Sequence, residues 1–444
     1  MKIVHWKDSG LQSQIWRIAW PATLSNISIP LLGLVDAAIL GHLDSPDYLG
    51  GVAVGAAILS FLYWGFSFLR MGTTGLVARA FGAGDIDRDR QVLGQSMILA
   101  LTLGGVVVLL HPWLLQLGVS LMDPGPSLAG IASSYAGIRV YSAPAVLTTY
   151  AITGWFIGHQ NTRWPLVFVL ITNGLNLALD FFFIIGLGMK GDGAALATLI
   201  AEYSGCALAL YALARHSGYR LDAKMLDAIR RYEQYRELLV TNRHLFLRTL
   251  CLMFSFAFFT SQSAQMGPDV LAANTILLNL LLLAAHGLDG LAHASEALCG
   301  SAVGAGKIRL FYQSSIALAA WSLLIATGLS GFFLFAGHHL YPILTNISAV
   351  LALFPAYHPW LVALPIIAAG SYLMDGIFIG TSKTRYMYYT MLISTFVVYL
   401  PAWYFTQGMG NHGLWLAFTL FNGVRGVGLG YFFWRLTRRE QWLD

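Results

Sequence analysis

The chain has 444 residues, of which 57% are hydrophobic and only 11% are charged. A soluble domain carries about 25% charged residues, so this composition excludes a soluble globular protein and predicts one that lies in a membrane. A net charge of +5 would favour nucleic acid as the partner of a soluble protein, but here the basic residues follow membrane topology, and we expect no nucleic-acid partner.

Twelve apolar stretches are long enough to cross a bilayer, which takes about 20 residues. They predict an all-α, polytopic membrane protein with twelve transmembrane helices, separated by turn sequences such as MDPGPS and GMKGDG. The first stretch has no clear cleavage site, so we expect it to be retained. In chain order the stretches are residues 15–40, 51–78, 92–117, 131–158, 164–187, 193–214, 245–267, 271–303, 312–336, 357–381, 386–406 and 412–434.

Asp36 lies inside the first stretch, within the sequence PLLGLVDAAILGHLDS at residues 30–45. A charge at the centre of a bilayer costs about 2.5–3.5 kcal/mol on insertion scales, so an acid within a span is a candidate functional residue. Because burial disfavours the charged form of a carboxyl, such an acid can take up a proton from the periplasm and release it inward. Pro21 and Pro30 each remove a backbone hydrogen bond from the same helix, which predicts either a helix that bends as the acid titrates or static kinks.

The fourth, fifth and sixth stretches carry further polar residues. Asn173, Asn176 and Asp180 occur at i, i+3 and i+7 of the fifth stretch, so they share one helical face. The directions of the spans place Asp180 at a depth similar to that of Asp36. We expect one polar cluster in the first half, which either couples protons and binds substrate or only holds the helices together. Its other predicted members are Tyr135, Arg139, Thr198 and Glu202.

The eighth stretch carries a second polar stripe at helical spacing. It is compatible with a proton relay, an ion site, a metal site or the lining of a wet cavity, of which we favour the last. The stripe consists of His286, Asp289, His293 and Glu296. Asp375 in the tenth stretch is a further intramembrane acid, predicted to lie nearer the cytoplasm.

The basic residues are unevenly distributed over the segments between the spans. Alternate segments, which share one side of the membrane, hold 22 of the 26 Lys and Arg residues, and the opposite side holds only Lys190. Because cytoplasmic loops are enriched in Lys and Arg, this asymmetry predicts that both termini are cytoplasmic. The remaining three arginines, Arg70, Arg139 and Arg425, are assigned to spans. Of these, Arg70 and Arg425 can neutralise acids of their own halves, but the sequence does not pair them.

The sequence contains an internal repeat whose offset is half the length of the chain. FGAGD at 81–85 recurs as VGAGK at 303–307, and GWFIGHQNTR at 154–163 recurs as GIFIGTSKTR at 376–385. Six spans return each half to the same side, so the repeats are predicted to be parallel, as in many transporters with substrate between the halves. We predict an N-terminal six-helix lobe at 1–214, a cytoplasmic linker at 215–243 that is a solvated connector or a short amphipathic helix, and a C-terminal six-helix lobe at 244–444.

Several segments resemble the multidrug and toxic compound extrusion (MATE) family, and within it the DinF branch. The resemblance covers essentially the whole chain and implies two six-helix lobes that form a V, with cation-coupled antiport of organic, often cationic, compounds. The segments that carry it are WPATLSNISIPLLGLVDAAILGHLDSPDYLGGVAVG, RMGTTGLVARAFGAG, ALATLIAEY and MDGIFIGTSKTR.

The resemblance also implies roles for individual residues. Asp36 matches the family's coupling acid on the first span, and Pro21 matches its kink proline. Relatives that use sodium in the second lobe have an acid on span seven, which this chain lacks between Leu245 and Gly267. That departure favours protons, although the acid on span ten does match Asp375. The polar partners in the first lobe match Asn176, Asp180 and Thr198, and more loosely Tyr135.

These observations predict a monomeric proton/drug antiporter that lies among the lipids of a bacterial inner membrane. Protonation of Asp36 and Asp180 is expected to reshape the first helix and shrink the first-lobe cavity, which expels the substrate. No nucleotide-binding phosphate loop is visible, so an ion gradient should supply the energy, without a cofactor or metal. The alternatives are a sodium-coupled antiporter and a flippase for lipid-linked precursors. A membrane enzyme would need a nucleophile and base or a metal, which only the stripe in span eight approaches.

Overall fold

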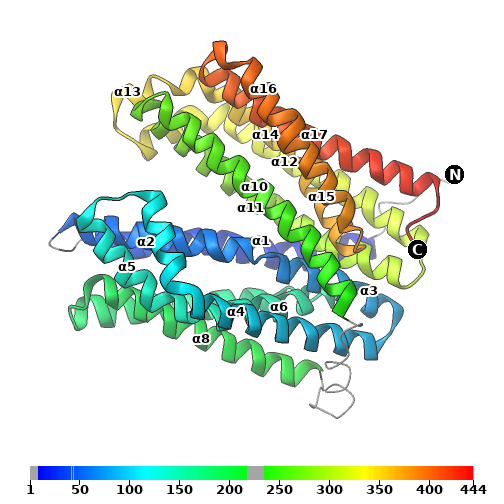
Figure 1. Ribbon diagram of the computed structural model, residues 1–444. Coiled ribbons are helices and arrows are strands. Elements are labelled where there is room, and N and C mark those ends of the chain that lie inside the picture. Colours follow the sequence, from blue (N-terminus) through cyan, green and yellow to red (C-terminus); the bar gives the residue numbers. More distant parts are fainter. Residues whose placement is uncertain (1–8, 42, 44, 218–234, 444) are drawn as a thin grey trace. The chain divides into compact units, whose positions relative to one another are not determined.

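The computed structural model describes residues 9–41, 43, 45–217 and 235–443 (Figure 1). Most of the predicted linker, residues 218–234, lies outside the described residues, and so does its predicted amphipathic character. The described residues form helices and contain no β-strand. The prediction of an all-α membrane protein is therefore confirmed, and every predicted span is largely helical.

The helices of the first half of the chain contain the first six predicted spans. Two of these spans are interrupted: α2 and α3 are separated at residues 66–67, and α5 continues into α6 through a short 3₁₀ turn, η1. The elements are α1 (Ser9–Leu40), α2 (Pro46–Gly65), α3 (Phe68–Ala83), α4 (Ile86–Met122), α5 (Pro126–Arg139), η1 (Val140–Ser142), α6 (Ala143–Gly158), α7 (Arg163–Asp180), the π-helix η2 (Phe181–Gly186) and α8 (Lys190–Ser217).

The second half contains the other six. Its first helix begins at residue 236, nine residues before the predicted span. The elements are α10 (Arg236–Gln265), α11 (Pro268–Gly304), α12 (Ile308–Leu344), α13 (Ser348–Leu351), α14 (Phe354–Gly380), α15 (Thr384–Leu392), the π-helix η4 (Ile393–Tyr399), α16 (Leu400–Phe405), η5 (Gln407–Met409) and α17 (Asn411–Arg438).

The chain divides into two compact units, which do not follow the chain order completely. The N-terminal unit comprises Leu24–Val77 and Asp85–Asn242, and the C-terminal unit comprises Met1–Thr23, Ala78–Gly84 and Arg243–Asp444. The boundary therefore falls inside α1, two residues after Pro21, and α1 remains helical through both Pro21 and Pro30.

The internal repeat is visible in the local structure of both halves. Gly84 and Gly306, which are equivalent positions of the repeat, have φ of 69° and 67° and end equivalent helices in the left-handed conformation that favours glycine. The same offset relates two non-glycine residues with positive φ, Gln160 at 58° and Ser382 at 57°. Helix packing also repeats, because α4 packs on α6 in one unit as α12 packs on α14 in the other. The repeat predicted from sequence is thus a repeat of backbone geometry.

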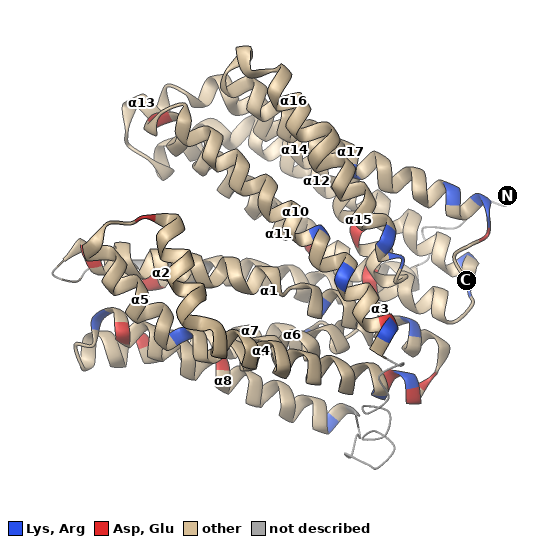
Figure 2. Cartoon of the chain, in the orientation of Figure 1, with Lys and Arg blue, Asp and Glu red and all other residues tan. Residues whose placement is uncertain are grey.

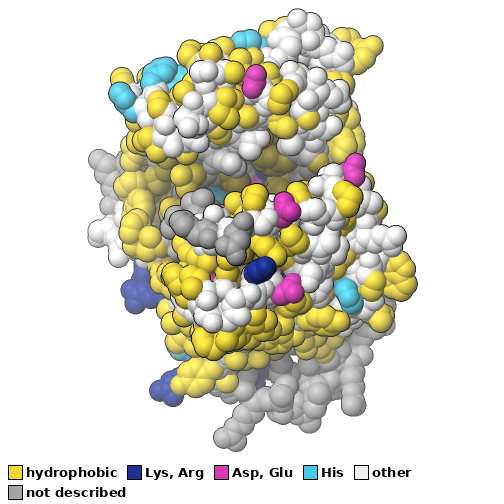
Figure 3. Space-filling view, turned by 90° about the vertical axis from the view of Figure 1, so that its left-hand side faces the viewer, with side chains coloured by type: hydrophobic (Ala, Val, Ile, Leu, Met, Phe, Trp, Pro, Cys, Tyr) yellow, Lys and Arg dark blue, Asp and Glu magenta, His cyan; other side chains and the backbone are white. Residues whose placement is uncertain are grey.

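Each unit has its own apolar core and an apolar outer surface. The largest core cluster of the C-terminal unit centres on Phe259, Trp415 and Phe421, all fully buried. Large apolar side chains such as Phe335 and Phe405 are 80% and 82% exposed. Figure 3 shows hydrophobic side chains over much of the visible surface. Charged residues are concentrated near the helix ends (Figure 2). Exposed apolar helix surfaces with charges at the ends are expected where lipid replaces water as the solvent. Eight of the described helical stretches are individually long and apolar enough to span a bilayer.

Candidate functional site

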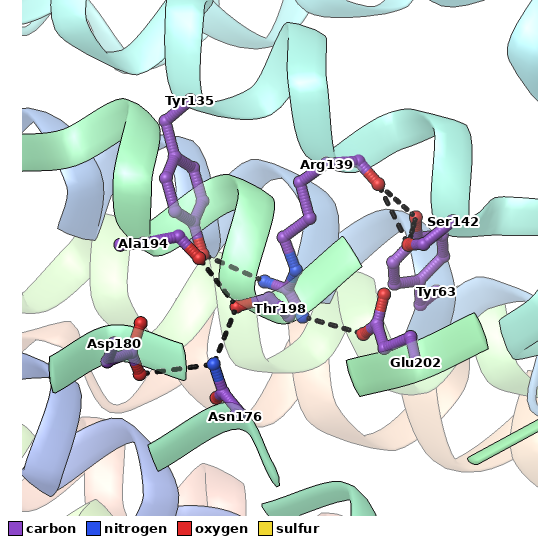
Figure 4. Close-up of polar contacts among 9 residues, drawn as sticks. All are labelled: Tyr63, Tyr135, Arg139, Ser142, Asn176, Asp180, Ala194, Thr198 and Glu202. Carbon is purple, nitrogen blue, oxygen red and sulfur yellow. Dashed lines mark hydrogen bonds and ion pairs between the residues drawn. The ribbon is translucent and has the colours of Figure 1, made fainter. Parts of the chain in front are cut away.

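The N-terminal unit buries an acid on α7 within a polar network. Asp180 is completely buried, and Asn176, one turn earlier, donates from Nδ2 to Asp180 Oδ2 at 3.1 Å (Figure 4). The same Nδ2 lies 3.4 Å from Thr198 Oγ1 on α8, whose hydroxyl donates to the Ala194 carbonyl. The two N–H groups of the Asn176 amide thus bridge Asp180 on α7 and Thr198 on α8. The face predicted from the spacing of Asn176 and Asp180 is the one that α8 covers.

Asp36 on α1 joins this network. It is half-buried, and its carboxyl lies within hydrogen-bonding reach of the Asp180 carboxyl. The Oδ1 atoms of both acids are buried and have no hydrogen-bond partner among the described residues. Two carboxylates this close repel each other strongly unless a proton or another cation lies between them. The pair is therefore a place where binding a proton removes an electrostatic cost.

The helix that carries Asp180 changes its hydrogen bonding directly after this residue. Residues Phe181–Gly186 form a π-helix, in which Leu187 N–H bonds to the Phe182 carbonyl at 3.0 Å. Such π segments are rare and often occur at functional sites, because the extra residue shifts the side chains around the helix. The wider turn begins next to the acid pair.

A second polar group lies beside the acid pair. Arg139, the last residue of α5, donates from Nη2 to Glu202 Oε1 on α8 at 3.1 Å and from Nη1 to the Tyr135 hydroxyl at 3.3 Å (Figure 4). The Glu202 carboxylate is mostly shielded from solvent. Arg139 is also close enough to Asp36 for a direct electrostatic interaction. The guanidinium thus lies between Glu202 and the acid pair.

The backbone around Arg139 is held in place. Its carbonyl accepts hydrogen bonds from Ser142 Oγ at 2.8 Å and from the Tyr63 hydroxyl at 3.5 Å, where α5 passes into η1. The α2–α5 packing depends on Gly55, since a Cβ there would lie 2.8 Å from Tyr135 Cδ1. Small residues allow this close approach of membrane helices. The elements that hold Arg139 are therefore fixed by packing, while its side chain bridges two partners.

In the C-terminal unit, the buried acid is paired with arginines. Asp375 on α14 accepts hydrogen bonds at one oxygen, Oδ2, from Arg248 on α10 and from Arg425 on α17, the latter at 2.9 Å. Arg425 also donates to Asn422 Oδ1 at 3.2 Å. All three charged side chains are nine-tenths buried or nearly so. Arg425 does neutralise an acid of its own half, as its position within a span suggested.

Arg248 corrects the count of cytoplasmic charges. The 22 basic residues counted in the flanking segments include Arg248, but the structure places it thirteen residues into the continuous helix α10, where it is buried against Asp375. The signal was already present in the sequence, because Arg248 lies inside the predicted span 245–267. It belongs with the intramembrane arginines and leaves 21 basic residues in the flanking segments.

The predicted stripe on span eight lies on α11 in the C-terminal unit. Glu296 and His293 are buried, with 2% and 9% exposure, while His286 and Asp289 are half-buried. His293 Nδ1 lies 2.6 Å from the Asp289 carbonyl, a bond within its own helix. Among the described residues, no group of three or more His, Cys, Asp and Glu side chains is arranged to hold a metal ion.

The structure brings together most of the residues predicted for the first-lobe cluster. Asn173 is at its edge, where its Nδ2 donates to the Ser28 carbonyl of α1 at 3.1 Å. Pro21 belongs to the C-terminal unit, unlike Asp36 of the same helix. Sequence reasoning missed Tyr63 and Tyr150, because tyrosines in apolar spans are common and carry no distinguishing spacing. The residues brought together are Asp36, Tyr135, Arg139, Asn176, Asp180, Thr198 and Glu202.

Comparison with known proteins decides the family. The family model described as MatE matches the chain twice, over residues 21–182 and 245–405, once in each half. The chain belongs to the MatE family. It is 38% identical to DNA damage-inducible protein F of Escherichia coli (strain K12), over 96% of this chain and 93% of that protein. The predicted resemblance to the MATE family and its DinF branch is thereby confirmed.

Solved structures agree on the fold over the full length. A crystal structure described as MATE in the bent conformation superposes with a TM-score of 0.88 at 20% identity and covers 100% of both chains. A structure described as the outward-facing conformation of a multidrug resistance MATE family transporter of the MOP superfamily gives 0.87 at 20% identity, covering 99% of this chain and 98% of that one. The chain has the MATE fold, and the prediction that it is a transporter and not an enzyme is confirmed.

Proposed function

We propose that this transporter exchanges protons for organic, often cationic, compounds and exports them across a bacterial inner membrane, with both termini in the cytoplasm. The observation that carries the proposal is the contact between the Asp36 and Asp180 carboxyls, from two different helices. Two acids that share one site bind a proton readily and release it when their surroundings become more polar. An ion gradient supplies the energy, and no cofactor is required.

Protonation of the acid pair changes what holds α1 in place. Without protons, the two negative charges repel each other and favour a nearby cation. With protons, the carboxyls can hydrogen-bond to each other, which draws α1 toward α7 around Asp36 and Asp180. Pro21 and Pro30 lack backbone N–H groups, so α1 can bend near them at low cost. In this mechanism, protons entering from the periplasm pull α1 inward, shrink the substrate space of the N-terminal unit and expel the substrate.

The charges of the N-terminal unit favour a positively charged substrate. The polar cluster contains three acids, Asp36, Asp180 and Glu202. The guanidinium of Arg139 interacts with two of them, Glu202 and Asp36. A structurally similar protein is described as a multidrug resistance transporter, which supports a range of organic compounds as substrates. Drug-like cations carry both the charge and the apolar surface that such a site binds.

Transport into proteoliposomes tests the coupling ion directly. Purified protein is reconstituted, and movement of the lipophilic cation tetraphenylphosphonium is followed under an imposed proton gradient or an imposed sodium gradient. We expect the proton gradient to drive transport and the sodium gradient at clamped pH to have no effect. Equal transport driven by sodium alone would reject proton coupling and favour the sodium-coupled alternative.

A further inference from the structure

Glu202 has surroundings that the proton-coupling mechanism does not use. Its Oε1 accepts the hydrogen bond from Arg139, but its Oε2 is buried and has no partner among the described residues. Tyr63 on α2, Tyr135 on α5 and Tyr150 on α6 all lie within electrostatic range of this carboxylate. The carboxylate thus lies within electrostatic range of three tyrosines from three helices, and one of its two oxygens has no hydrogen-bond partner in the described part of the chain.

This combination is the one that binds organic ammonium groups. Aromatic rings attract a cation through their electron-rich faces, and a carboxylate supplies the opposite full charge. In the structure, the guanidinium of Arg139 occupies the place of such a cation. Its Nη2 contacts the carboxylate and its Nη1 contacts the Tyr135 hydroxyl. Arg139 is therefore the cation that the protein itself supplies to the Glu202 carboxylate.

Arg139 has a second anionic partner nearby, Asp36. It interacts electrostatically with Asp36, and Tyr135, its hydrogen-bond partner, is also within range of Asp36. Since its carbonyl is held by Ser142 and Tyr63, only the side chain needs to turn. Side-chain rotation of a long arginine requires no movement of α5.

We infer that Glu202 and the three tyrosines form the subsite for the positively charged group of the substrate, and that Arg139 competes with the substrate for it. The inference rests on the proposed function. When Asp36 and Asp180 carry protons, Arg139 stays on Glu202 and excludes the substrate. When they lose protons, their negative charge draws Arg139 away and Glu202 accepts the substrate cation.

The relay makes proton and substrate binding mutually exclusive, as antiport requires. One guanidinium serves two anionic partners, so neutralising one partner sends it to the other. Loading protons from the periplasm returns Arg139 to Glu202 and displaces the substrate there. The ionisable groups that face this relay come from each surrounding helix: Asp36 of α1, Tyr63 of α2, Arg70 of α3, which interacts with Tyr150, Tyr135 of α5, Tyr150 of α6, Asp180 of α7 and Glu202 of α8.

Binding of tetraphenylphosphonium to the purified full-length protein in lipid nanodiscs, measured from pH 6 to pH 8, tests the subsite. For the native protein we expect weaker binding as the pH falls. Glu202→Gln should weaken binding at pH 8 by at least about tenfold, the size of one charge-assisted contact. Arg139→Gln should bind about equally at pH 6 and pH 8, whereas Arg139→Lys, which keeps the charge, should restore the pH dependence.

Three further variants test the same subsite. Asp192→Asn, an exposed acid on the same helix α8, is the matched control and should bind like the native protein. Tyr150→Leu should weaken binding by about threefold or more, whereas Tyr150→Phe keeps the ring and should not. This pair remains decisive if Arg139→Gln fails to fold, because Tyr150 is only half-buried.

The outcome separates the subsite from the proposed function. Normal binding by Glu202→Gln, an unchanged pH dependence in Arg139→Gln, or equal binding by the Leu and Phe variants of Tyr150 would each overturn the subsite. Proton-driven transport by the native protein would still stand in those cases, because it depends on Asp36 and Asp180. If an imposed proton gradient did not drive transport by the native protein, the proposed function itself would be rejected.

Discussion

The two units surround their buried acids in opposite ways. In the N-terminal unit, Asp36 and Asp180 lie beside each other, and each has a buried oxygen with no hydrogen-bond partner among the described residues. In the C-terminal unit, Arg248 and Arg425 both donate to one oxygen of Asp375. The first arrangement leaves negative charge to be neutralised by a proton or a ligand, whereas the second already neutralises its carboxylate with two cations.

The repeat therefore conserves the backbone and not the charge. Helix ends and left-handed turns recur at equivalent positions of the two halves, but the positions equivalent to Asp36 and Asp180 hold Phe258 and Ala402. The C-terminal acid has its own place on α14. One fold thus provides two scaffolds. The side chains decide which scaffold places two acids beside each other and which holds its acid with fixed ion pairs.

The largest expected effect comes from the acid pair. Asp36→Asn should fold normally but reduce proton-driven export by about 100-fold or more, because an amide cannot release a proton. Asp180→Asn should impair export equally or somewhat less, since the remaining carboxyl, Asp36, lies on α1, the helix that is proposed to bend. Gradient-driven efflux of tetraphenylphosphonium at matched expression measures both.

A third acid serves as the control for this prediction. Asp85 caps α4, where its carboxylate accepts from the Arg88 N–H at 2.9 Å, and asparagine caps a helix about equally well. Asp85→Asn should therefore be nearly silent. Normal export by Asp36→Asn would show that this acid is structural, and the contrast between the two units would then lose its functional meaning.

The same change in the C-terminal unit should act on stability. Asp375→Asn leaves two buried guanidiniums without their carboxylate, which we expect to destabilise the protein by about 3–5 kcal/mol. Thermal unfolding in detergent measures the loss. The fraction that remains folded should still export in a proton-dependent manner. If the variant kept native stability and lost proton coupling, Asp375 would be a second coupling acid, and the proposed difference between the units would be wrong.

Sequence predicted the helices and the acid pair for physical reasons that can be named. Hydrophobic length predicts spans, and the spacing of Asn176 and Asp180 predicts a shared face. It did not predict that Arg248 and Arg425 converge on Asp375, because pairing between distant helices depends on their rotation and depth. Tyr63 and Tyr150 were missed because tyrosines are common in apolar spans, and their approach to Glu202 also depends on how distant helices pack. Linear spacing describes one helix at a time, whereas these contacts join helices.

A change in the packing of α2 against Tyr135 should have a smaller effect on stability and export. Gly55→Ala places a Cβ 2.8 Å from Tyr135 Cδ1 and from the Ala132 carbonyl, so α2 or α5 must shift. We expect a loss of about 1–3 kcal/mol in stability and slower export, because Tyr135 orients Arg139.

Gly130→Ala on α5, with nothing within 4 Å of the new Cβ, is the matched control. In the second half, the position equivalent to Gly55 holds Leu277, so this requirement belongs to the N-terminal unit alone. Equal behaviour of the two variants would show that Tyr135 is not held by this contact.

The smallest expected effect on transport comes from cysteines that report which side of the membrane each repeat faces. Ser127 and Ala349 are exposed and occupy equivalent positions of the repeat, and so do Asp87 and Arg309. Single cysteines at these positions should change export by less than about twofold, because exposed sites tolerate substitution. At position 127 the change removes only an exposed hydrogen bond from Ser127 to Asp47. The native Cys206, Cys251 and Cys299 are buried and should react slowly.

If the repeats are parallel, an impermeant maleimide added to intact cells should label the cysteines at 127 and 349 and spare those at 87 and 309. The labelling follows from the charge asymmetry, which puts the basic segments on the cytoplasmic side. Opposite labelling within either pair would mean that the repeats are inverted, and equivalent positions of the two halves would then no longer lie at equivalent depths.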